Sequence, residues 1–496
     1  MRFYALDPAL EGAIRDGNAQ ARVRVELGSG DGTWSEVAEG DLLAATFTSA
    51  HEKEGGTASR GELVLDNAEG AYTAEGDGKG SGRAVLVSFS VGYGQPFVPR
   101  FSFYADGAGF RELKGPGTRR RVLVGLEDLS GLLRRTDAAR DWTDRASFAF
   151  VRVCDKTDPS SSLVHLAALR AGLGTADIDC STIGLGLDWV SLGRDLWAEL
   201  SDLARTYRCH LECAVEKPLV FAHSPYQDEA ENGAESSWRF DGGNVYCLRS
   251  CALRDGYRNT VRLKINLPRV LARQELWRYE DPPVGWDGAL RPTYAFRAAA
   301  VRAVSEAGYV ARYRVREAGG VLREVVYADQ VDLEAEASAR LDYTGGPLAY
   351  TAYDTASRRD GAVVRLEAVG DADLHGASIH GRPIVLDLNT CCFARDEEEI
   401  ALEGTCALNV TGSLFSYSPW GGRPMYEDWA ERELEERRRP RRAFLVRTNR
   451  AVFHARVGAL VTVADGGEEA GALIRALRFS YRRDGAFSAS FDLEEA

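Results

Sequence analysis

Apolar and polar side chains alternate without a break over residues 261–267, which read VRLKINL. A period of two places every second side chain on the same face of an extended chain, so this segment predicts a β-strand with one buried face. The same alternation recurs over residues 22–27, 85–91 and 122–124, and glycine-rich segments such as residues 76–82 separate these runs. Short alternating strands joined by glycine turns favour a β-barrel or a β-sandwich.

Residues 146–226 have a different pattern, in which helical spacing replaces the alternation. Apolar side chains over residues 196–207 recur at steps of three and four, which predicts a helix with a single apolar stripe. A shorter helix is expected after Ser160 or Ser161, either of which can cap it, and should end near Gly172. Two short strands follow as a hairpin. This segment is therefore predicted to be a small α/β module.

The last third of the chain contains an internal repeat. Residues 332–343 and 426–437 both read as helices, and each is followed by a proline (Pro347 or Pro440), a strand, a glycine and a second strand. Alanine, leucine and proline occupy matching positions in the two copies without a gap. Repetition of one supersecondary unit is typical of similar domains that pack side by side. We therefore expect two similar domains in this part of the chain.

Together these patterns predict a mainly β fold with α+β modules, in which barrel-like, tube-type domains accompany a small α/β insert. The chain has 496 residues, so about three or four domains are expected. The expected domains are an N-terminal barrel-like domain (1–145), the α/β insert (146–228), a second β-rich domain with the first copy of the repeat (229–370), and a C-terminal β-rich domain with the second copy (371–496).

The composition limits the partners that the protein can have. The formal net charge of -13 argues against a protein that grips nucleic acid through many phosphate contacts. No apolar run approaches the roughly 20 residues that cross a bilayer, so no membrane-spanning segment is expected. The first residues lack the pattern of a secretory signal, and nine cysteines are too few for a disulfide scaffold. Synthesis in the cytoplasm with free thiols is expected.

Two cysteine pairs have spacings that could hold zinc. Cys209 and Cys213 form one pair, Cys247 and Cys251 form the other, and His210 lies beside the first. Residues four apart on a strand, however, lie about 13 Å apart, too far for neighbouring ligands of one ion. We interpret these cysteines as buried thiols and expect no metal and no cofactor, with zinc at this set as the alternative.

No catalytic motif is complete in the sequence. It contains no GxSxG elbow, no Walker loop and no GxGxxG between a strand and a helix, and Gly55 stands where a zinc protease would need its second histidine. Acidic residues at 371 and 373, 397–399 and 494–495 could supply the two carboxylates that a glycosidase needs. However, such acidic runs are typical of solvated surfaces. We expect no catalytic residues and no enzymatic activity.

Three aromatic residues in turn-like segments are the candidates for contacts with partner proteins. Trp286 lies in the proline-rich segment 281–292, and Tyr417 and Trp420 lie in the sequence YSPW. Aromatic side chains supply much of the binding energy at protein interfaces. We predict that these three residues contact partners.

The order of these elements resembles the hub proteins at the tail tips or baseplates of tailed phages, gene transfer agents and related injection particles. Residues 61–73 (GELVLDNAEGAYT) are similar to a signature in which an alternating strand runs into Asn, an acidic residue with Gly, and an aromatic residue. Residues 85–94 and 100–104 resemble the next two strands, and residues 121–133 the strand that runs into an Asp-Leu turn. Residues 195–207 resemble the family's helix, which a hairpin follows, and a closing antiparallel pair of strands ends the chain.

This resemblance implies a homotrimer in the tail of a virion or phage-like particle, synthesised in the bacterial cytoplasm. Each subunit would supply two similar barrel-like domains, so that three chains form a ring of pseudo-sixfold symmetry. Such a hub would join the sixfold tail tube to the threefold tip. Its partners would be tail tube and distal tail proteins, tip or fibre proteins, and the tape-measure protein.

The ring would also line the channel through which DNA is ejected without specific binding. An acidic channel wall would repel the phosphate backbone of DNA. Two alternatives remain open from the sequence alone: a cell-wall or polysaccharide hydrolase delivered by the particle, and a tail protein that binds carbohydrate or a receptor.

Overall fold

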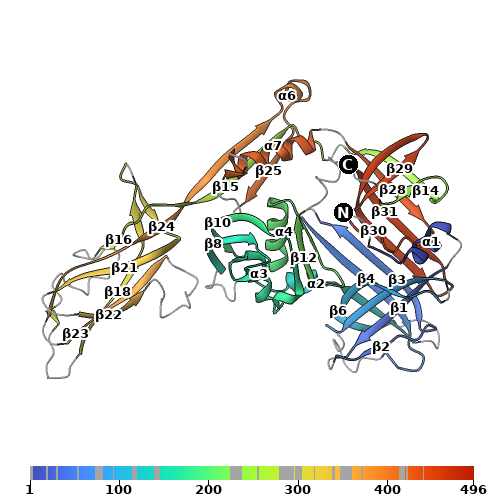
Figure 1. Ribbon diagram of the computed structural model, residues 1–496, viewed down its shortest axis with the longest axis horizontal. Coiled ribbons are helices and arrows are strands. Elements are labelled where there is room, and N and C mark those ends of the chain that lie inside the picture. Colours follow the sequence, from blue (N-terminus) through green and yellow to red (C-terminus); the bar gives the residue numbers. More distant parts are fainter. Residues whose placement is uncertain are drawn as a thin grey trace.

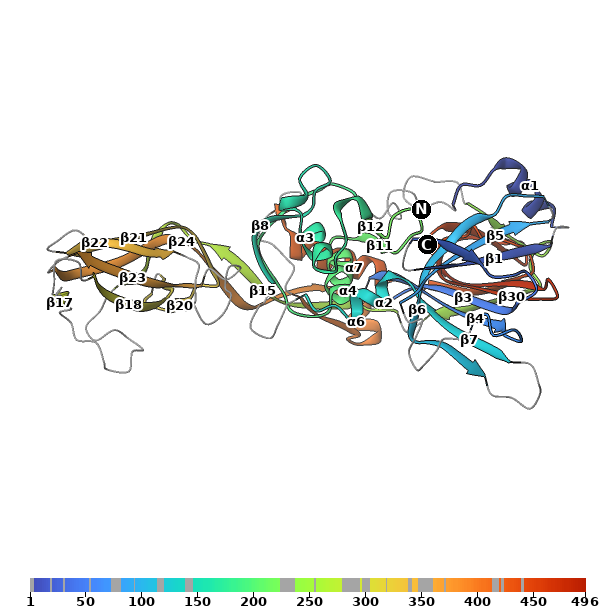
Figure 2. The ribbon, with the colours of Figure 1, turned by 90° about the horizontal axis from the view of Figure 1, so that it is seen from below.

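The protein is described here by a computed structural model, in which three lobes lie in a row (Figure 1). The described residues are 4–17, 20–29, 32–52, 55–72, 82–92, 94–113, 120–138, 146–223, 237–253, 256–278, 295–296, 304–317, 319–337, 341–346, 360–369, 372–412, 419–420, 423–438 and 441–496. One end lobe contains both chain termini, an α/β module lies in the middle, and a slender β lobe projects from the opposite side (Figures 1 and 2).

The first lobe is built around one large sheet to which both ends of the chain contribute. Its N-terminal strands are β1 (Ala21–Gly28), β2 (Trp34–Glu36), β3 (Leu42–His51), β4 (Gly56–Asp66), β5 (Ala84–Val91), β6 (Val98–Leu113) and β7 (Arg121–Glu127). Its later strands are β13 (Arg239–Phe240), β14 (Cys247–Leu253), β28 (Arg441–Thr448), β29 (Leu460–Asp465), β30 (Glu468–Arg482) and β31 (Phe487–Glu495). The mainly β class and the alternating N-terminal strands are therefore confirmed.

The two ends of the chain meet at the antiparallel pairing of β3 with β30, where Phe47 lies opposite Phe479. From this seam the strand order runs through β31 and β28 to β14 on one side, and through β4, β7, β6, β5 and β1 to β2 on the other. Among the described residues this path is open, because β14 and β2 do not pair with each other to close a barrel.

One hydrophobic core fills the lobe and includes side chains from residue 10 to residue 493. Phe89 of β5 stacks on Phe453 with ring centroids 5.4 Å apart, and its edge contact with Phe479 reaches the C-terminal strands. Arg100 of β6 donates to the carbonyl oxygens of Phe453 and Ala455, at 3.0 and 2.9 Å. The N-terminal and C-terminal strands therefore pack as a single body.

The middle module carries its own core. Its first part contains β8 (Ala146–Cys154), α3 (Leu163–Arg170), β9 (Ile178–Cys180), β10 (Ile183–Leu192), α4 (Leu196–Thr206), β11 (Cys209–Glu212) and β12 (Leu219–His223). The predicted helix at 196–207 is confirmed as α4, capped by Asp195, whose side chain accepts from the backbone N–H of Ala198. The predicted helix after Ser160 or Ser161 is confirmed as α3, but the N-cap position is Ser162, whose side chain makes no capping hydrogen bond.

The module attaches to the large sheet through backbone and side-chain contacts. β11 pairs in parallel with the start of β4, so that Leu211 lies opposite Gly56. A side chain at Gly56 would lie 2.5 Å from the ring of Trp197, so glycine is required for this close approach. The indole N–H of Trp197 also donates to Glu52 Oε2 at 2.8 Å. These contacts fix the module beside the seam of the sheet.

The projecting lobe is connected to the module by two long strands (Figure 2). Of these, β15 (Thr260–Val270) contains the alternating segment 261–267, which is confirmed as a strand with Val261, Leu263, Ile265 and Leu267 all buried. Its antiparallel partner β24 (Ala372–Arg395) continues into the lobe and pairs there with β16 (Gln274–Arg278) and β21 (Tyr327–Ala337). The projecting lobe also contains β18 (Val304–Arg312), β22 (Leu341–Gly346) and β23 (Gly361–Val369) (Figure 1). The elements α6 (Glu397–Glu403), β25 (Ala407–Gly412) and α7 (Met425–Arg437) lie at the module end of the two long strands, where α7 packs into the core of the module (Figure 1).

The helix predicted over residues 332–343 is wrong. Residues 332–337 form the end of β21 and residues 341–343 form the start of β22. Ala, Glu and Leu are good helix formers, but Leu333, Ala335 and Ala337 also alternate with acidic residues, and pairing with β24 overrides the local preference. The second copy, residues 426–437, is helical as predicted. The two segments therefore differ in structure, while Pro347 and the strand expected after it lie outside the described residues.

The strand pairing also departs from the expected domain boundaries. β13 and β14, expected in the domain 229–370, pair with β29 and β28 of the large sheet. β24, expected in the last domain, belongs to the projecting lobe and the module. The pairing partners are distant in sequence, so local patterns could not assign them.

None of the described helices is long and apolar enough to cross a membrane.

Candidate functional site

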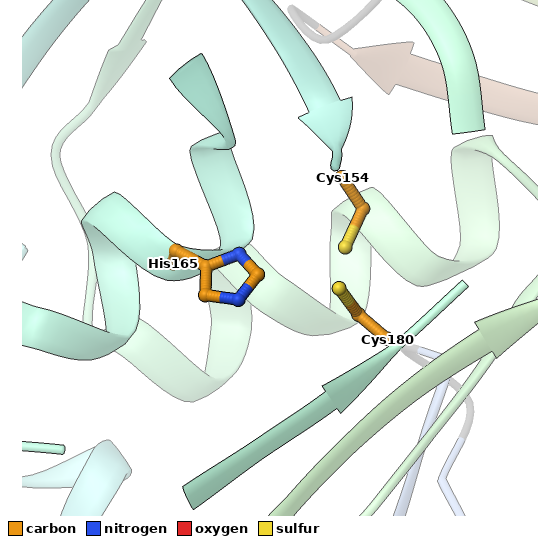
Figure 3. Close-up of side chains that lie close together, drawn as sticks. All are labelled: Cys154, His165 and Cys180. Atoms are coloured by element: carbon orange, nitrogen blue, oxygen red, sulfur yellow. The ribbon is translucent and has the colours of Figure 1, made fainter. Parts of the chain in front are cut away.

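Two thiols and one imidazole converge inside the middle module. Cys154 ends β8, Cys180 ends β9, and His165 lies in the first turn of α3. One ligand atom from each residue lies within 4.8 Å of the other two, and all three residues are buried. The ring of His165 turns its nitrogen-bearing edge toward the two sulfur atoms (Figure 3). Among the described residues this is the one group of three or more metal-ligating side chains at such distances.

Local sequence patterns place each of these side chains in the core of the module. In β8 the alternation brings Val151 and Val153 inward, and the strand ends at the buried Cys154. In α3 the buried face includes Leu163 and Ala167 together with His165. β9 has an inward–outward–inward pattern that points Cys180 into the core. The three residues therefore come from three separate elements.

Burial and mutual contact set the protonation states of the group. Burial lowers the pKa of His165, so its ring is neutral near pH 7. A hydrogen bond between the two thiols raises the pKa of Cys154 and lowers that of Cys180, because the Cys154 thiol donates to the Cys180 sulfur and stabilises the Cys180 thiolate. His165 Nδ1 lies 2.7 Å from Ser162 Oγ, a contact that orients the ring. A neutral imidazole beside one readily ionised thiol is suited to binding a metal ion.

The four cysteines singled out from the sequence are placed elsewhere. Cys209 begins β11 and Cys213 directly follows that strand, whereas Cys247 and Cys251 lie on β14 at the edge of the large sheet. They do not form a group of three ligands within 4.8 Å among the described residues. The short spacing in the sequence pointed to these pairs, but strand pairing between distant segments brings Cys154 and Cys180 together instead. Cys154 and Cys180 were missed because 25 residues and several elements separate them.

The aromatic residues predicted to contact partners remain a prediction. Trp286 and Tyr417 lie outside the described residues. Trp420 belongs to the two-residue strand β26 (Pro419–Trp420), whose partner is β27 (Arg423–Pro424).

Where the structure describes them, the acidic pairs named from the sequence lie in ion pairs or in an unburied helix. Glu494 is bound by Arg441 and Arg475, at 2.9 and 2.7 Å, and these cations lower its pKa although burial opposes them. Glu495 is bound by Arg442. Residues 397–399 occupy the first turn of α6, in which no residue is buried. Residue 371 lies outside the described residues.

A second candidate site is the outer edge of the large sheet, formed by β14. This strand pairs with β28 on one side only, and Tyr246, just before it, is 61% exposed. Residues 249–252 are also exposed. The carbonyl of Arg447 points toward β14, where it accepts from the backbone N–H of Tyr246, so the residues opposite Arg447, Leu445 and Ala443 bond to β28 and the N–H groups of Leu248, Ser250 and Ala252 face outward. An exposed edge of this length can accept a strand from another chain.

Comparisons with known proteins returned tail proteins among the solved structures. The tail protein from Neisseria meningitidis has 12% identity and a TM-score of 0.48, covering 96% of this chain and 97% of that one. The prophage MuSo2 43 kDa tail protein from Shewanella oneidensis has 11% identity and a TM-score of 0.47, covering 95% and 98%. The E. coli c3393 protein, a component of the type VI secretion system, has 11% identity and a TM-score of 0.37, covering 91% and 73%.

No protein-family model matches the sequence, and no curated protein is similar to it in sequence. The resemblance stated from the sequence was to phage tail-tip hub proteins, and the structures returned include a prophage tail protein.

Proposed function

We propose that this protein is the structural hub at the distal end of a phage-like tail. The observation that carries this proposal is the continuous sheet to which both chain ends contribute, with β14 and β2 as its two end strands. Unpaired edges invite association, and pairing between neighbouring subunits removes that hazard. A ring of identical subunits can satisfy both edges if one end strand meets the opposite end of the next copy.

In this hub three subunits close the ring. Each chain offers one group of strands on each side of the β3–β30 seam. With two groups per chain, three chains present six groups of strands around the axis. The strand groups then act as the barrel-like, tube-type domains that seat on a sixfold tail tube. The projecting lobe, held on β15 and β24, extends away from this ring toward tip or fibre proteins. Distal tail and tape-measure proteins are the remaining partners.

The hub is connective and not enzymatic. Its role is to join the tube to the tip and to wall the channel through which the tape-measure protein and DNA leave the particle. The net charge of -13 suits a wall that DNA passes without binding, because like charge repels the phosphate backbone. The ion-paired Glu494 and Glu495 offer no unpaired carboxylate for hydrolysis.

The edge of β14 supplies a direct test of the ring. We expect Ser250→Pro to convert the trimer to monomer, because proline removes an outward N–H and introduces a ring into the subunit contact. The carbonyl group left unpaired in each contact costs about 1–3 kcal/mol, which corresponds to roughly 5- to 150-fold weaker association. The β14–β28 ladder itself keeps its hydrogen bonds. Light scattering and native mass spectrometry, with and without tube protein, measure the oligomeric state.

Ser250→Thr is the matched control, because it also enlarges the side chain but keeps the backbone N–H. It should form trimers like the unchanged protein, and circular dichroism should report the same fold for both variants. A wild-type chain that stays monomeric at every concentration, even with tube protein present, contradicts the hub. Trimers that persist in Ser250→Pro show instead that β14 does not form the contact.

A further inference from the structure

We propose that Cys154, His165 and Cys180 bind one zinc ion that ties β8, α3 and β9 together. The sequence did not indicate this set, and the proposed hub function does not require it. The site would act in the folding of the middle module, which carries the seam-side contacts to the large sheet.

The spacing of the ligand atoms fits a tetrahedral ion after small movements. Zinc–sulfur bonds of about 2.3 Å in a tetrahedron place two sulfurs about 3.8 Å apart. The present atoms already lie within 4.8 Å of one another, so a shift of about 1 Å brings them into range. The contact between Ser162 and His165 Nδ1 leaves Nε2 to bind the ion, as is usual for a histidine ligand whose second nitrogen is held by a hydrogen bond.

Charge balance explains why such an ion would be stable in a buried position. Cys154 is fully buried, while His165 and Cys180 are 3% and 5% exposed. A buried charge is costly unless it is compensated. Zinc binding would displace one proton from each thiol into solvent, and two thiolates neutralise the two positive charges of the ion. The neutral His165 contributes its lone pair and releases no proton.

The donor set favours zinc over other metals. Two sulfurs and one imidazole nitrogen are typical ligands of structural zinc, whereas calcium and magnesium take oxygen ligands. An iron–sulfur cluster ordinarily requires four cysteines. A further thiol is present nearby: Cys209 lies on the same face of the β9–β12–β11 sheet as Cys180, because Cys180, Phe221 and Leu211 are opposite one another. The fourth position therefore falls to Cys209 or to water.

The test uses the full-length chain, purified under reducing conditions and stripped of metal with a chelator. Zinc added alone should bind at one ion per chain, and metal analysis of protein purified without chelator should find zinc. Cobalt added in place of zinc should give the visible bands of a tetrahedral ion and sulfur-to-cobalt charge transfer. Charge transfer from two thiolates leaves water as the fourth ligand, and charge transfer from three assigns Cys209; both results support the site.

Variants connect the bound ion to these residues. Cys154→Ser, Cys180→Ser and His165→Gln should each weaken zinc binding by more than about 100-fold, since even the hydrogen-bond partners of metal ligands are worth about 10–100-fold. Cys392→Ser is the matched control, because Cys392 is a partly buried thiol against the same core and should leave binding unchanged.

Three results would overturn the proposal. The first is a folded wild-type chain that binds neither zinc nor cobalt. The second is zinc binding that survives in Cys154→Ser and Cys180→Ser. The third is purified protein with iron and sulfide, or with a disulfide between the two cysteines, in place of zinc. If the variants fail to fold, the cobalt spectrum of the wild-type chain still decides the question.

Discussion

Replacement of Phe89 with alanine is expected to lower the free energy of unfolding by about 3–5 kcal/mol. The side chain is fully buried in the core of the first lobe. It stacks on Phe453 and makes edge contacts with Phe47 and Phe479, at centroid distances of 5.4, 5.8 and 6.0 Å. Its removal would leave a cavity that strands from both ends of the chain cannot easily fill.

Chemical unfolding followed by circular dichroism and fluorescence measures this effect. If the N-terminal and C-terminal strands share one core, both should unfold together at lower denaturant concentration. Leu402→Ala serves as the control, since Leu402 is 80% exposed on α6 and its loss should change stability by less than about 0.5 kcal/mol. A loss below about 1 kcal/mol for Phe89→Ala, or separate unfolding of the two ends, would contradict a shared core.

The second large effect is a loss of stability in acid, for which His454 is a principal cause. Burial lowers the pKa of His454 from 6.5 to about 4. Its ring is 4% exposed and lies edge-on to Trp238, at 5.8 Å. When the pKa of a histidine is lower in the folded protein than in the unfolded chain, falling pH protonates the unfolded chain first and so favours unfolding. Its contribution is therefore fully present above pH 6.5 and is lost as the pH falls toward 4, by about 3 kcal/mol in total.

His454→Phe keeps an aromatic ring but cannot titrate. The difference in unfolding free energy between pH 8 and pH 4 should therefore be about 3 kcal/mol smaller in this variant than in the wild-type protein. Comparison at pH 8, where the wild-type ring is neutral in both states, isolates the change in packing. Burial also raises the pKa of Asp128 to about 6, which acts in the opposite direction but is common to both proteins. Equal pH dependence in the two proteins would refute the assignment.

His210 should add to the same acid sensitivity. Its Nε2 lies 2.9 Å from Glu212 Oε2, a contact that would ordinarily raise the pKa of a histidine. Glu212 is also bound by Arg456, whose positive charge offsets the carboxylate. Burial and Arg456 therefore lower the pKa of His210, to about 3.

Sequence patterns predicted individual elements well where one face of the element is buried. The alternation at 261–267 gave β15, and the apolar stripe at 196–207 gave α4, because burial on one side leaves a period in the sequence. Residues 332–343 are compatible with both the helical spacing and the alternation of a strand. The presence of β24 as a pairing partner decides in favour of the strand. The order of strands in the large sheet could not be predicted, because β3 and β30 lie more than 400 residues apart.

The candidate metal site was beyond sequence reasoning for a related reason. Each ligand looks like an ordinary core residue in its own element. Cys180 reaches the site through the parallel pairing of β9 with β12, and that pairing leaves no local signature. Short spacings in the chain pointed to Cys209 and Cys213 instead, although residues four apart on a strand do not converge.

The route of the chain between β14 and β28 has a consequence for how such proteins can diversify. These strands are hydrogen-bonded neighbours, yet the chain leaves the sheet after Leu253 and returns only at Arg441. The entropic cost of closing a loop grows slowly with its length, so the stability of the sheet depends little on what the excursion contains. Evolution could lengthen, shorten or exchange the projecting lobe to suit new attachment partners, while the framework that holds it stayed the same.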